Sequence, residues 1–336
     1  MTGRVLVTGG SGVVGRAVVE RLRSDDREVV ALVRSAAAAE TVRGLGASPV
    51  RGDVLDPGSV RDAAAGCETV FHVAGVNAMC RRDPSALYET NVDGTASVVR
   101  SAASAGVRRV VVTSSAATLG EPHGEVGNER SVHRGSYLSH YERSKHLGER
   151  VAFAVADEVG IEVVCVNPSS VQGPGRIDGS ARLLLEIVRR RRVALVDASI
   201  SLVDIADCAE GHLLAERAGV PGERYVLSGA SVSTRDAVAT LQRVWGRPER
   251  VRWIGPAVAR IGGAAIELGG RVARRDVPVC REAVRTLLHG HRYDGSRAER
   301  ELGLRYTPLE ETLERTLEWY AERGLVPPRR DRPAAA

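Results

Sequence analysis

Residues 5–15 read VLVTGGSGVVG, and this stretch decides the fold. Val5–Thr8 is a short apolar run typical of a strand, and a helix-like stretch follows from Gly15. Between them, Gly9 permits a tight turn, Gly12 lets a pyrophosphate approach the backbone, and Gly15 lets the helix pack on the strand. The free N–H groups and the dipole at the start of such a helix attract phosphate. The stretch therefore predicts a dinucleotide-binding loop.

The same alternation of strand-like and helix-like segments continues through the first half of the chain. The further strand-like runs are Val29–Val33, Thr69–Val73, Val110–Thr113 and Val163–Asn167, and the helix-like stretches are Gly15–Arg23, Ser59–Ala65 and Ala86–Ala105. The runs are continuously apolar, as strands are when helices cover both faces of a sheet. We therefore predict an α/β fold with a doubly wound parallel sheet of the Rossmann type.

The pattern loosens after Pro168. A Gly/Pro-rich stretch at 172–179 is followed by shorter elements, namely a strand at Tyr225–Leu227 and helices at Thr234–Trp245 and Leu309–Glu322. We expect a dinucleotide-binding core over 1–168 and a smaller C-terminal α/β substrate-binding subdomain over 169–326, with the chain crossing back to the core. Residues 327–336 are predicted to be a disordered tail. The apolar segment Pro256–Arg271 is interpreted as a buried helix, with a lid helix or a dimer contact as the alternatives.

Composition excludes several classes of protein. The chain has 336 residues, of which 43% are hydrophobic and 26% charged, and no segment approaches the length of a membrane span. Its five cysteines are odd in number, scattered and without a CxxC pair. This usage favours reduced, mostly buried thiols in a cytoplasm over disulfides or zinc. We therefore predict a cytoplasmic protein that binds no metal.

The net charge of +5 is modest for this length. The one sharp basic run, Arg189–Arg192, is interpreted as the solvated end of a helix, where cations oppose the helix dipole. We expect no nucleic-acid partner and no membrane partner.

The end of the second strand bears on which cofactor is bound. A carboxylate there would bind the ribose 2′-hydroxyl of NAD, whereas an arginine would accept the 2′-phosphate of NADP. The strand ends in Val33-Arg34-Ser35, with no acid at its tip. We therefore predict a preference for NADP(H), with NAD(H) as the alternative. Asp53, after the third strand, is predicted to lie near the adenine amino group.

Tyr141-Glu142-Arg143-Ser144-Lys145 forms a YxxxK motif. A spacing of four places Tyr141 and Lys145 on one face of a helix. An ammonium beside a phenol favours the phenolate, which suits a tyrosine that exchanges protons near neutral pH. Lys145 is also the only lysine among 47 Lys and Arg residues. Since a guanidinium does not replace a compact ammonium at a tight site, we predict that Lys145 is catalytic.

Ser115 follows the fourth strand and therefore lies at the carboxyl end of the sheet, where ligands bind in such folds. Its hydroxyl is predicted to hydrogen-bond the reacting oxygen, with Ser114 as the rival candidate. Tyr137 lacks a lysine four residues later and is not a candidate.

These motifs resemble those of the extended short-chain dehydrogenase/reductase superfamily, the NAD-dependent epimerase/dehydratase family. The resemblance covers nearly the whole chain and is closest to dihydroflavonol reductase-like, 3β-hydroxysteroid dehydrogenase-like and hopanoid-associated sugar epimerase-like members. It is carried by TGGSGVVG (8–15), GDVLD (52–56), HVAG (72–75), NVDGT (91–95), TSSAATLG (113–120), YERSK (141–145) and NPSSVQGPG (167–175).

The resemblance implies a catalytic triad of Ser115, Tyr141 and Lys145, with Asn91 as a structural helper. It also implies that Pro168 and Val171 lie beside the nicotinamide. The full set expected to bind the cofactor is Thr8, Gly9, Ser11, Gly12, Val13, Val14, Gly15, Arg34, Asp53, Val54, Ala74, Gly75, Tyr141, Lys145, Pro168 and Val171.

The expected activity is reduction of a carbonyl, or oxidation of the alcohol, in a fairly apolar small molecule. A nucleotide-sugar epimerase with the same triad and an NADP(H)-sensing protein without turnover are the alternatives. Dehydration is not expected, because Ala116-Ala117 replace the Asp-Glu pair of sugar dehydratases. Residues 196–202 carry one acid and no cation for a diphosphate, which favours the apolar substrate. The one protein partner considered is a second copy, in a homodimer.

Overall fold

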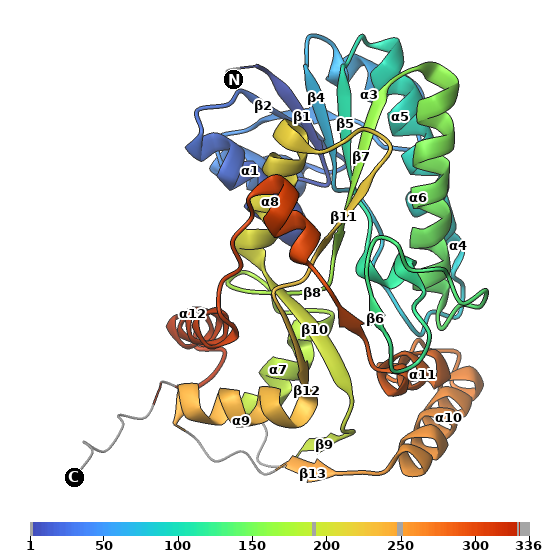
Figure 1. Cartoon of the computed structure of the whole chain (residues 1–336), viewed down its shortest axis with the longest axis vertical. Helices are drawn as coiled ribbons and strands as arrows, with labels where there is room; N and C mark the ends of the chain where they lie inside the picture. The colour runs from blue at the N-terminus through green and yellow to red at the C-terminus, as the bar shows by residue number, and fades with distance from the viewer. Residues whose placement is uncertain (1–2, 190–192, 247–250, 328, 330–336) are drawn as a thin grey trace.

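The computed structural model describes residues 3–189, 193–246, 251–327 and 329 (Figure 1). Its largest element is a seven-stranded sheet with the order β11-β7-β5-β4-β1-β2-β3, in which all neighbours are parallel. The predicted doubly wound sheet is therefore confirmed. The strand order reverses between β1 and β4, where such sheets bind ligands. The strands are β1 (Val5–Thr8), β2 (Val29–Val33), β3 (Ser48–Arg51), β4 (Thr69–His72), β5 (Arg109–Thr113), β7 (Glu162–Pro168) and β11 (Arg224–Leu227).

The burial of the strands explains their sequences. Every residue of β1, β2 and β4 is buried, as the continuous apolar runs predict for a sheet covered on both faces. β3 is the exception, since its residues are only partly buried and include Pro49. A proline has no N–H for the ladder and is tolerated at an edge, which is where β3 lies.

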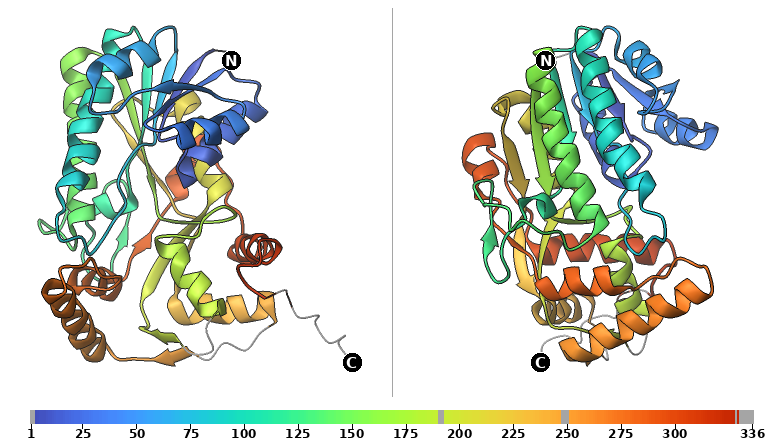
Figure 2. Two further views of the ribbon diagram at one scale, coloured as in Figure 1. Left: turned by 180° about the vertical axis from the view of Figure 1, so that it is seen from behind. Right: turned by 90° about the vertical axis from the view of Figure 1, so that its right-hand side faces the viewer.

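Helices cover the two faces of this sheet (Figures 1 and 2). On one face, apolar residues of α3, α5 and α6 form a core with the strands, and on the other α1 and α8 do so. Residues 205–227 return to the large sheet as α8 and β11. The helices of this part are α1 (Val13–Ser24), α2 (Ala36–Gly44), α3 (Pro57–Ala64), α5 (Gly94–Ser104), α6 (His140–Val159) and α8 (Ile205–Ala218).

The single helix predicted over Ala86–Ala105 is wrong in one respect, because the structure divides it. A short α4 (Ser85–Tyr88) leads into a π-helical segment, η1 (Glu89–Asp93), and only then into α5. The carbonyl of Asn91, in η1, faces Gly148 of α6 so closely that a β-carbon on Gly148 would lie 2.1 Å from the oxygen. The wide turn thus sits where two helices touch, and π-helical turns often mark functional sites.

The second half of the chain builds smaller sheets at the carboxyl end of the large one. Helices α7, α9 and α12 accompany these sheets and share a hydrophobic core that includes Trp245, Leu317 and Tyr320. A short 3-10 turn, η2 (Ala116–Leu119), follows β5. The elements are β6 (Val126–Gly127), β8 (Ser170–Gln172), α7 (Ser180–Arg189), β9 (Val193–Leu195), β10 (Ser199–Asp204), β12 (Ala230–Ser233), α9 (Thr234–Trp245), β13 (Val251–Trp253), α10 (Pro256–Val272), α11 (Arg281–His289), β14 (Arg292–Tyr293), η3 (Ala298–Leu302) and α12 (Leu309–Glu322).

The expectation that Pro256–Arg271 is a buried helix is wrong. α10 forms with α11 a hairpin at the lower end of the molecule (Figure 1), and only Ala259, Gly263 and Gly270 of α10 are buried. Its opposite face exposes Ile261 by 71%, Leu268 by 62% and Val272 by 80%. Apolar residues thus lie on both faces of α10, but among the described residues only the face with Ala259, Gly263 and Gly270 is covered.

The structure also bears on the predictions about membrane spans, the basic run and the C-terminal tail. Among the described residues, no helix is long and apolar enough to cross a membrane. Of the basic run, Arg189 ends α7, while residues 190–192 lie outside the described residues. Of the predicted tail, only residues 327 and 329 are described.

Candidate active site

The glycine loop between β1 and α1 has the geometry of a phosphate cradle. Gly9 has a φ of +72°, and a β-carbon there would lie 2.6 Å from the nitrogen of Ala74. A β-carbon on Gly15 would lie 2.1 Å from the oxygen of Gly9. Gly12 caps α1 without a side chain, so the N–H groups at the start of the helix face the cleft. Gly9 and Gly15 allow the backbone to pack this closely on itself, and the loop and helix start that result fit a dinucleotide phosphate.

The end of β2 presents a cation rather than an acid to the cleft. Arg34 lines the cleft with a side chain that is 75% exposed, and its guanidinium lies 3.9 Å from the carboxylate of Asp53. The flanking Gly52 and Val54 line the cleft, whereas Asp53 does not, and its carboxylate accepts a hydrogen bond from the nitrogen of Leu55. Thr8 also lies outside the cleft, buried behind the loop and bonded to His72.

Ser115, Tyr141 and Lys145 meet at the carboxyl end of β5. The Ser115 hydroxyl acts on the Tyr141 phenol and works to lower its pKa. Lys145, one turn along α6, donates from Nζ to the oxygen of Thr113 at 2.6 Å. Ser114 points away and donates to Glu149, so Ser115 is the serine beside the tyrosine. All three residues of the predicted triad line one cleft.

Burial governs the ionisation of this group. It lowers the pKa of Lys145 to about 8, against the raising effects of Cys165 and Glu149. It also raises the pKa of Tyr141, although the hydrogen bond from Ser115 and the charge of Arg176 oppose this rise. The lowered pKa expected for Tyr141 is therefore wrong in this structure, because the loss of water around the phenol has a larger effect on its pKa than the neighbouring groups.

Asn91 ties the loop after β4 to the catalytic helix. Its side chain accepts from the nitrogen of Val76 at 2.8 Å and donates both to the oxygen of Val76 at 3.0 Å and to Ser144 at 2.9 Å. Gly75, in the same loop, lies close to both residues, since a β-carbon there would be in tight contact with Asn91 at 3.1 Å and in ordinary contact with the Lys145 ammonium at 3.6 Å. The bonds of Asn91 are those of a supporting residue.

A buried polar network beneath the triad was not found from the sequence. Glu149 accepts from Asn167 at 2.6 Å and from Arg224 at 3.0 Å, and Thr118 also donates to it. Its members come from four elements, α6, β7, β11 and η2, that only the fold brings together. The sequence gives one signal, since Glu149 lies on the same face of α6 as Lys145.

The cleft runs from the glycine loop into the smaller sheets and has a volume of about 1440 Å³. Of the residues predicted to bind the cofactor, all but Thr8 and Asp53 line it. Beyond the triad its walls are mostly apolar, with Arg176 as a buried exception. The apolar walls include Val76, Met79, Leu184, Ile187, Leu202 and Leu241.

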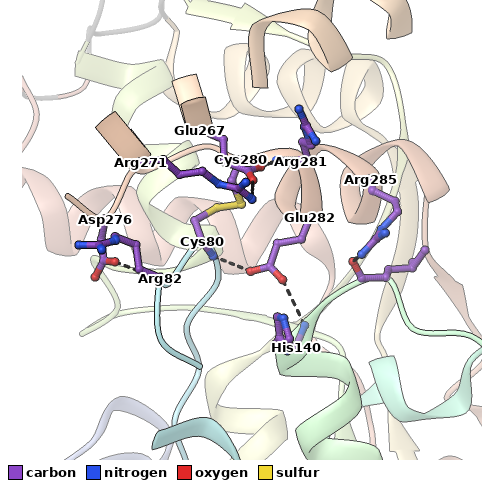
Figure 3. The surroundings of a disulfide bond; sticks show 11 residues. Cys80, Arg82, His140, Glu267, Arg271, Asp276, Cys280, Arg281, Glu282 and Arg285 are labelled. Atoms are coloured by element: carbon purple, nitrogen blue, oxygen red, sulfur yellow. Dashed lines mark hydrogen bonds and ion pairs between the residues drawn. A yellow bond between two sulfur atoms is a disulfide. The ribbon is translucent and has the colours of Figure 1, made fainter. Parts of the chain in front are cut away.

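The α10–α11 hairpin closes one side of the cleft through a disulfide (Figure 3). Cys80, in the loop after β4, is bonded to Cys280 at the start of α11. Glu282 accepts from the nitrogen of Cys80 at 2.6 Å and from that of His140, next to Tyr141, at 3.1 Å. The hairpin is thereby fastened to both the loop and the catalytic helix.

The disulfide corrects the expectation that the cysteines are all reduced. Cys67, Cys165 and Cys208 are buried free thiols as predicted, but Cys80 and Cys280 are paired across 200 residues. A pairing over that distance leaves no local signal in the sequence. Cysteine usage therefore no longer favours a cytoplasm, which remains a prediction without this support.

Breaking this bond is expected to destabilise the protein. A cross-link that spans 200 residues restricts the unfolded chain, and loss of such a bond typically costs about 2–4 kcal/mol of unfolding free energy. Thermal unfolding of the wild type should therefore shift to lower temperature when dithiothreitol is added, and Cys280→Ser should show the same shift without it. Dithiothreitol should not move the midpoint of the variant. An unchanged wild-type midpoint, despite proof of reduction by peptide mapping, would contradict the prediction.

Comparison with known families agrees with this geometry. The model of the NAD dependent epimerase/dehydratase family matches residues 5–228. The chain belongs to this family. As a family member it is an NAD(P)-dependent enzyme of the oxidoreductase and epimerase type that acts on sugars or other small molecules.

Relatives of the epimerase/dehydratase family match along almost the whole chain. A protein of Methylococcus capsulatus named sterol demethylase protein B is 32% identical over 96% of this chain and 99% of its own. A 2-alkyl-3-oxoalkanoate reductase of Stenotrophomonas maltophilia is 29% identical over 93% of this chain and 98% of its own. The solved structure of a dTDP-glucose 4,6-dehydratase of Streptomyces venezuelae with NAD bound has a TM-score of 0.77 and 25% identity, over 96% of this chain and 98% of the other.

Proposed function

We propose that the protein interconverts a carbonyl group and an alcohol in a fairly apolar small molecule, with NADP(H) as the preferred cofactor. The observation that carries the proposal is the meeting of Ser115, Tyr141 and Lys145 in one cleft with mostly apolar walls. The names of two relatives, a reductase of an oxoalkanoate and a sterol-processing protein, agree with such a substrate.

Each residue of the site would have a separate role in the reaction. Bound cofactor supplies or accepts the hydride. In reduction Tyr141 donates its proton to the carbonyl oxygen, and its raised pKa keeps it protonated at neutral pH for this role. Ser115 hydrogen-bonds the same oxygen, and the Lys145 ammonium stabilises negative charge that develops on it and on the phenol. The glycine loop would hold the pyrophosphate, and Pro168 and Val171 would lie beside the nicotinamide.

A nucleotide-sugar epimerase is the second candidate. It is favoured by the cations that reach the cleft, Arg81, Arg176 and Arg182. Against it, Ser199–Leu202 line the cleft without a cation, and Asp197 nearby already pairs with Arg235. An NADP(H)-sensing protein without turnover is the third candidate, and the intact triad argues against it.

A substrate panel tests the choice. NADPH oxidation at 340 nm is followed with aryl ketones, steroid ketones and flavanonols, and UDP-, dTDP- and GDP-sugars are assayed for epimerisation. We expect turnover in the carbonyl set alone. Epimerisation of any nucleotide sugar, with no reduction of the apolar compounds, would overturn the proposal. Binding of NADPH without turnover of either set would support the third candidate.

Replacing Arg34 with alanine is expected to remove the preference for NADPH. A charge-assisted bond to the 2′-phosphate at this exposed position should make NADPH bind about tenfold more tightly than NADH. Titration of both cofactors into wild type and Arg34→Ala measures the ratio, with Arg43→Ala on the outside of α2 as the control. Equal binding of NADH by the wild type, or no change in the variant, would refute the assignment.

A further inference from the structure

Arg176 is a buried cation in the wall of the cleft. It follows the turn Gly173-Pro174-Gly175 after β8 and is only 8% exposed. Its backbone oxygen accepts a hydrogen bond from Tyr320 at 2.6 Å, so its main chain is fixed to α12. It lies close enough to Tyr141 for its charge to lower the pKa of the phenol, against the larger raising effect of burial. Arg176 and Tyr141 also line the same cleft, so the guanidinium is available to a substrate that reaches the phenol.

Within the described part of the chain, Arg176 has no carboxylate at ion-pair distance and donates no side-chain hydrogen bond. Its Nε is buried without a partner. Other buried arginines differ. Arg27 makes a two-pronged bond to Glu216, and Arg109 pairs with Glu162 at 2.7 Å. Since a buried charge is costly unless it is paired, the missing partner of Arg176 points to a ligand.

We propose that the substrate carries a carboxylate close to the reacting carbonyl, and that Arg176 binds it. The inference rests on the proposed reductase function and narrows its substrate to an oxo acid, or to the hydroxy acid in the reverse direction. The planar guanidinium matches a carboxylate with two parallel hydrogen bonds. Tyr141 must reach the reacting oxygen within about 3 Å. Because Arg176 and Tyr141 line the same cleft, one small molecule can reach both, and the apolar walls are left for the rest of the molecule.

The test compares a matched pair of substrates, a 3-oxo fatty acid of medium length and its methyl ester, with NADPH and the full-length protein. In the wild type kcat/KM should favour the acid by at least about tenfold. Arg176→Gln should lower kcat/KM for the acid by about 10- to 100-fold and for the ester by less than about threefold. Arg176→Lys should restore part of the loss. Arg305→Gln, an exposed arginine outside the cleft, is the control.

A second measurement needs no variant and no turnover. The 3-hydroxy acid should raise the unfolding temperature of the NADP-bound wild type more than its methyl ester does. If acid and ester are reduced alike, or if Arg176→Gln slows both equally while it stays folded, Arg176 does not bind a substrate carboxylate, although the reductase function stands. If nucleotide sugars alone are turned over or stabilise the protein, Arg176 serves a diphosphate and the proposed function fails as well.

Discussion

Tyr141→Phe is expected to lower kcat by about a thousandfold, because the variant keeps the ring but loses the proton that the carbonyl oxygen receives. Cofactor binding should change little, because the substitution removes only a hydroxyl and leaves the glycine loop, which would hold the pyrophosphate, intact. Stopped-flow reduction of the best ketone from the panel, at saturating NADPH, measures the chemical step. Fluorescence titration with NADPH shows whether the site is intact.

Tyr137→Phe is the matched control, since Tyr137 lies four residues earlier and contacts His133 and His146 rather than Ser115. It should retain nearly full activity. Should Tyr141→Phe keep more than about a tenth of the wild-type rate, which corresponds to about 1.4 kcal/mol of transition-state stabilisation, Tyr141 is not the proton donor.

Lys145→Arg is expected to reduce turnover to below about a tenth of the wild-type rate although the positive charge is kept. The ammonium is a compact donor that reaches the oxygen of Thr113 at 2.6 Å beside Gly75, and a planar guanidinium does not fit the same space. The change in kcat is measured in the ketone assay, and circular dichroism checks that the variant is folded.

Arg143→Lys, two residues away on the exposed side of α6, makes the opposite exchange and should be silent. If Lys145→Arg remains as active as this control, the chain does not need an ammonium at this position. The absence of any other lysine would then be a matter of composition alone.

The large sheet could be predicted from the sequence more accurately than the α10–α11 hairpin. β1 and β2 begin and end where their strand-like runs do, because strands buried on both faces consist mostly of apolar residues. α10 misled the same reasoning, since an apolar helix is recognised by its composition whether or not a partner covers both of its faces. The π-helical turn at Asn91 was missed because it depends on the approach of Gly148, which is distant in the sequence.

Some features of the candidate site could likewise be predicted from the sequence, and others could not. Tyr141 and Lys145 are four residues apart, and the helix alone brings them together. The pairing of Cys80 with Cys280, the Glu149 network and the missing partner of Arg176 each depend on segments joined only by the fold. Whether a carboxylate lies near the Arg176 guanidinium depends on all the residues that surround it in the fold. The sequence therefore shows that position 176 is an arginine but not that it lacks an ion-pair partner.

The lone lysine also makes the active site chemically addressable. An ordinary lysine amine is almost wholly protonated at pH 8, whereas Lys145, with a pKa of about 8, is a neutral nucleophile for about half of the time. An acylating reagent therefore meets a single side-chain amine in the chain, and it is one whose charge the reaction needs. One acyl group on Lys145 should silence the enzyme, and bound cofactor should shield it. A covalent tag that peptide mapping assigns to Lys145, and not to the N-terminal amine, would thus count intact active sites in a preparation.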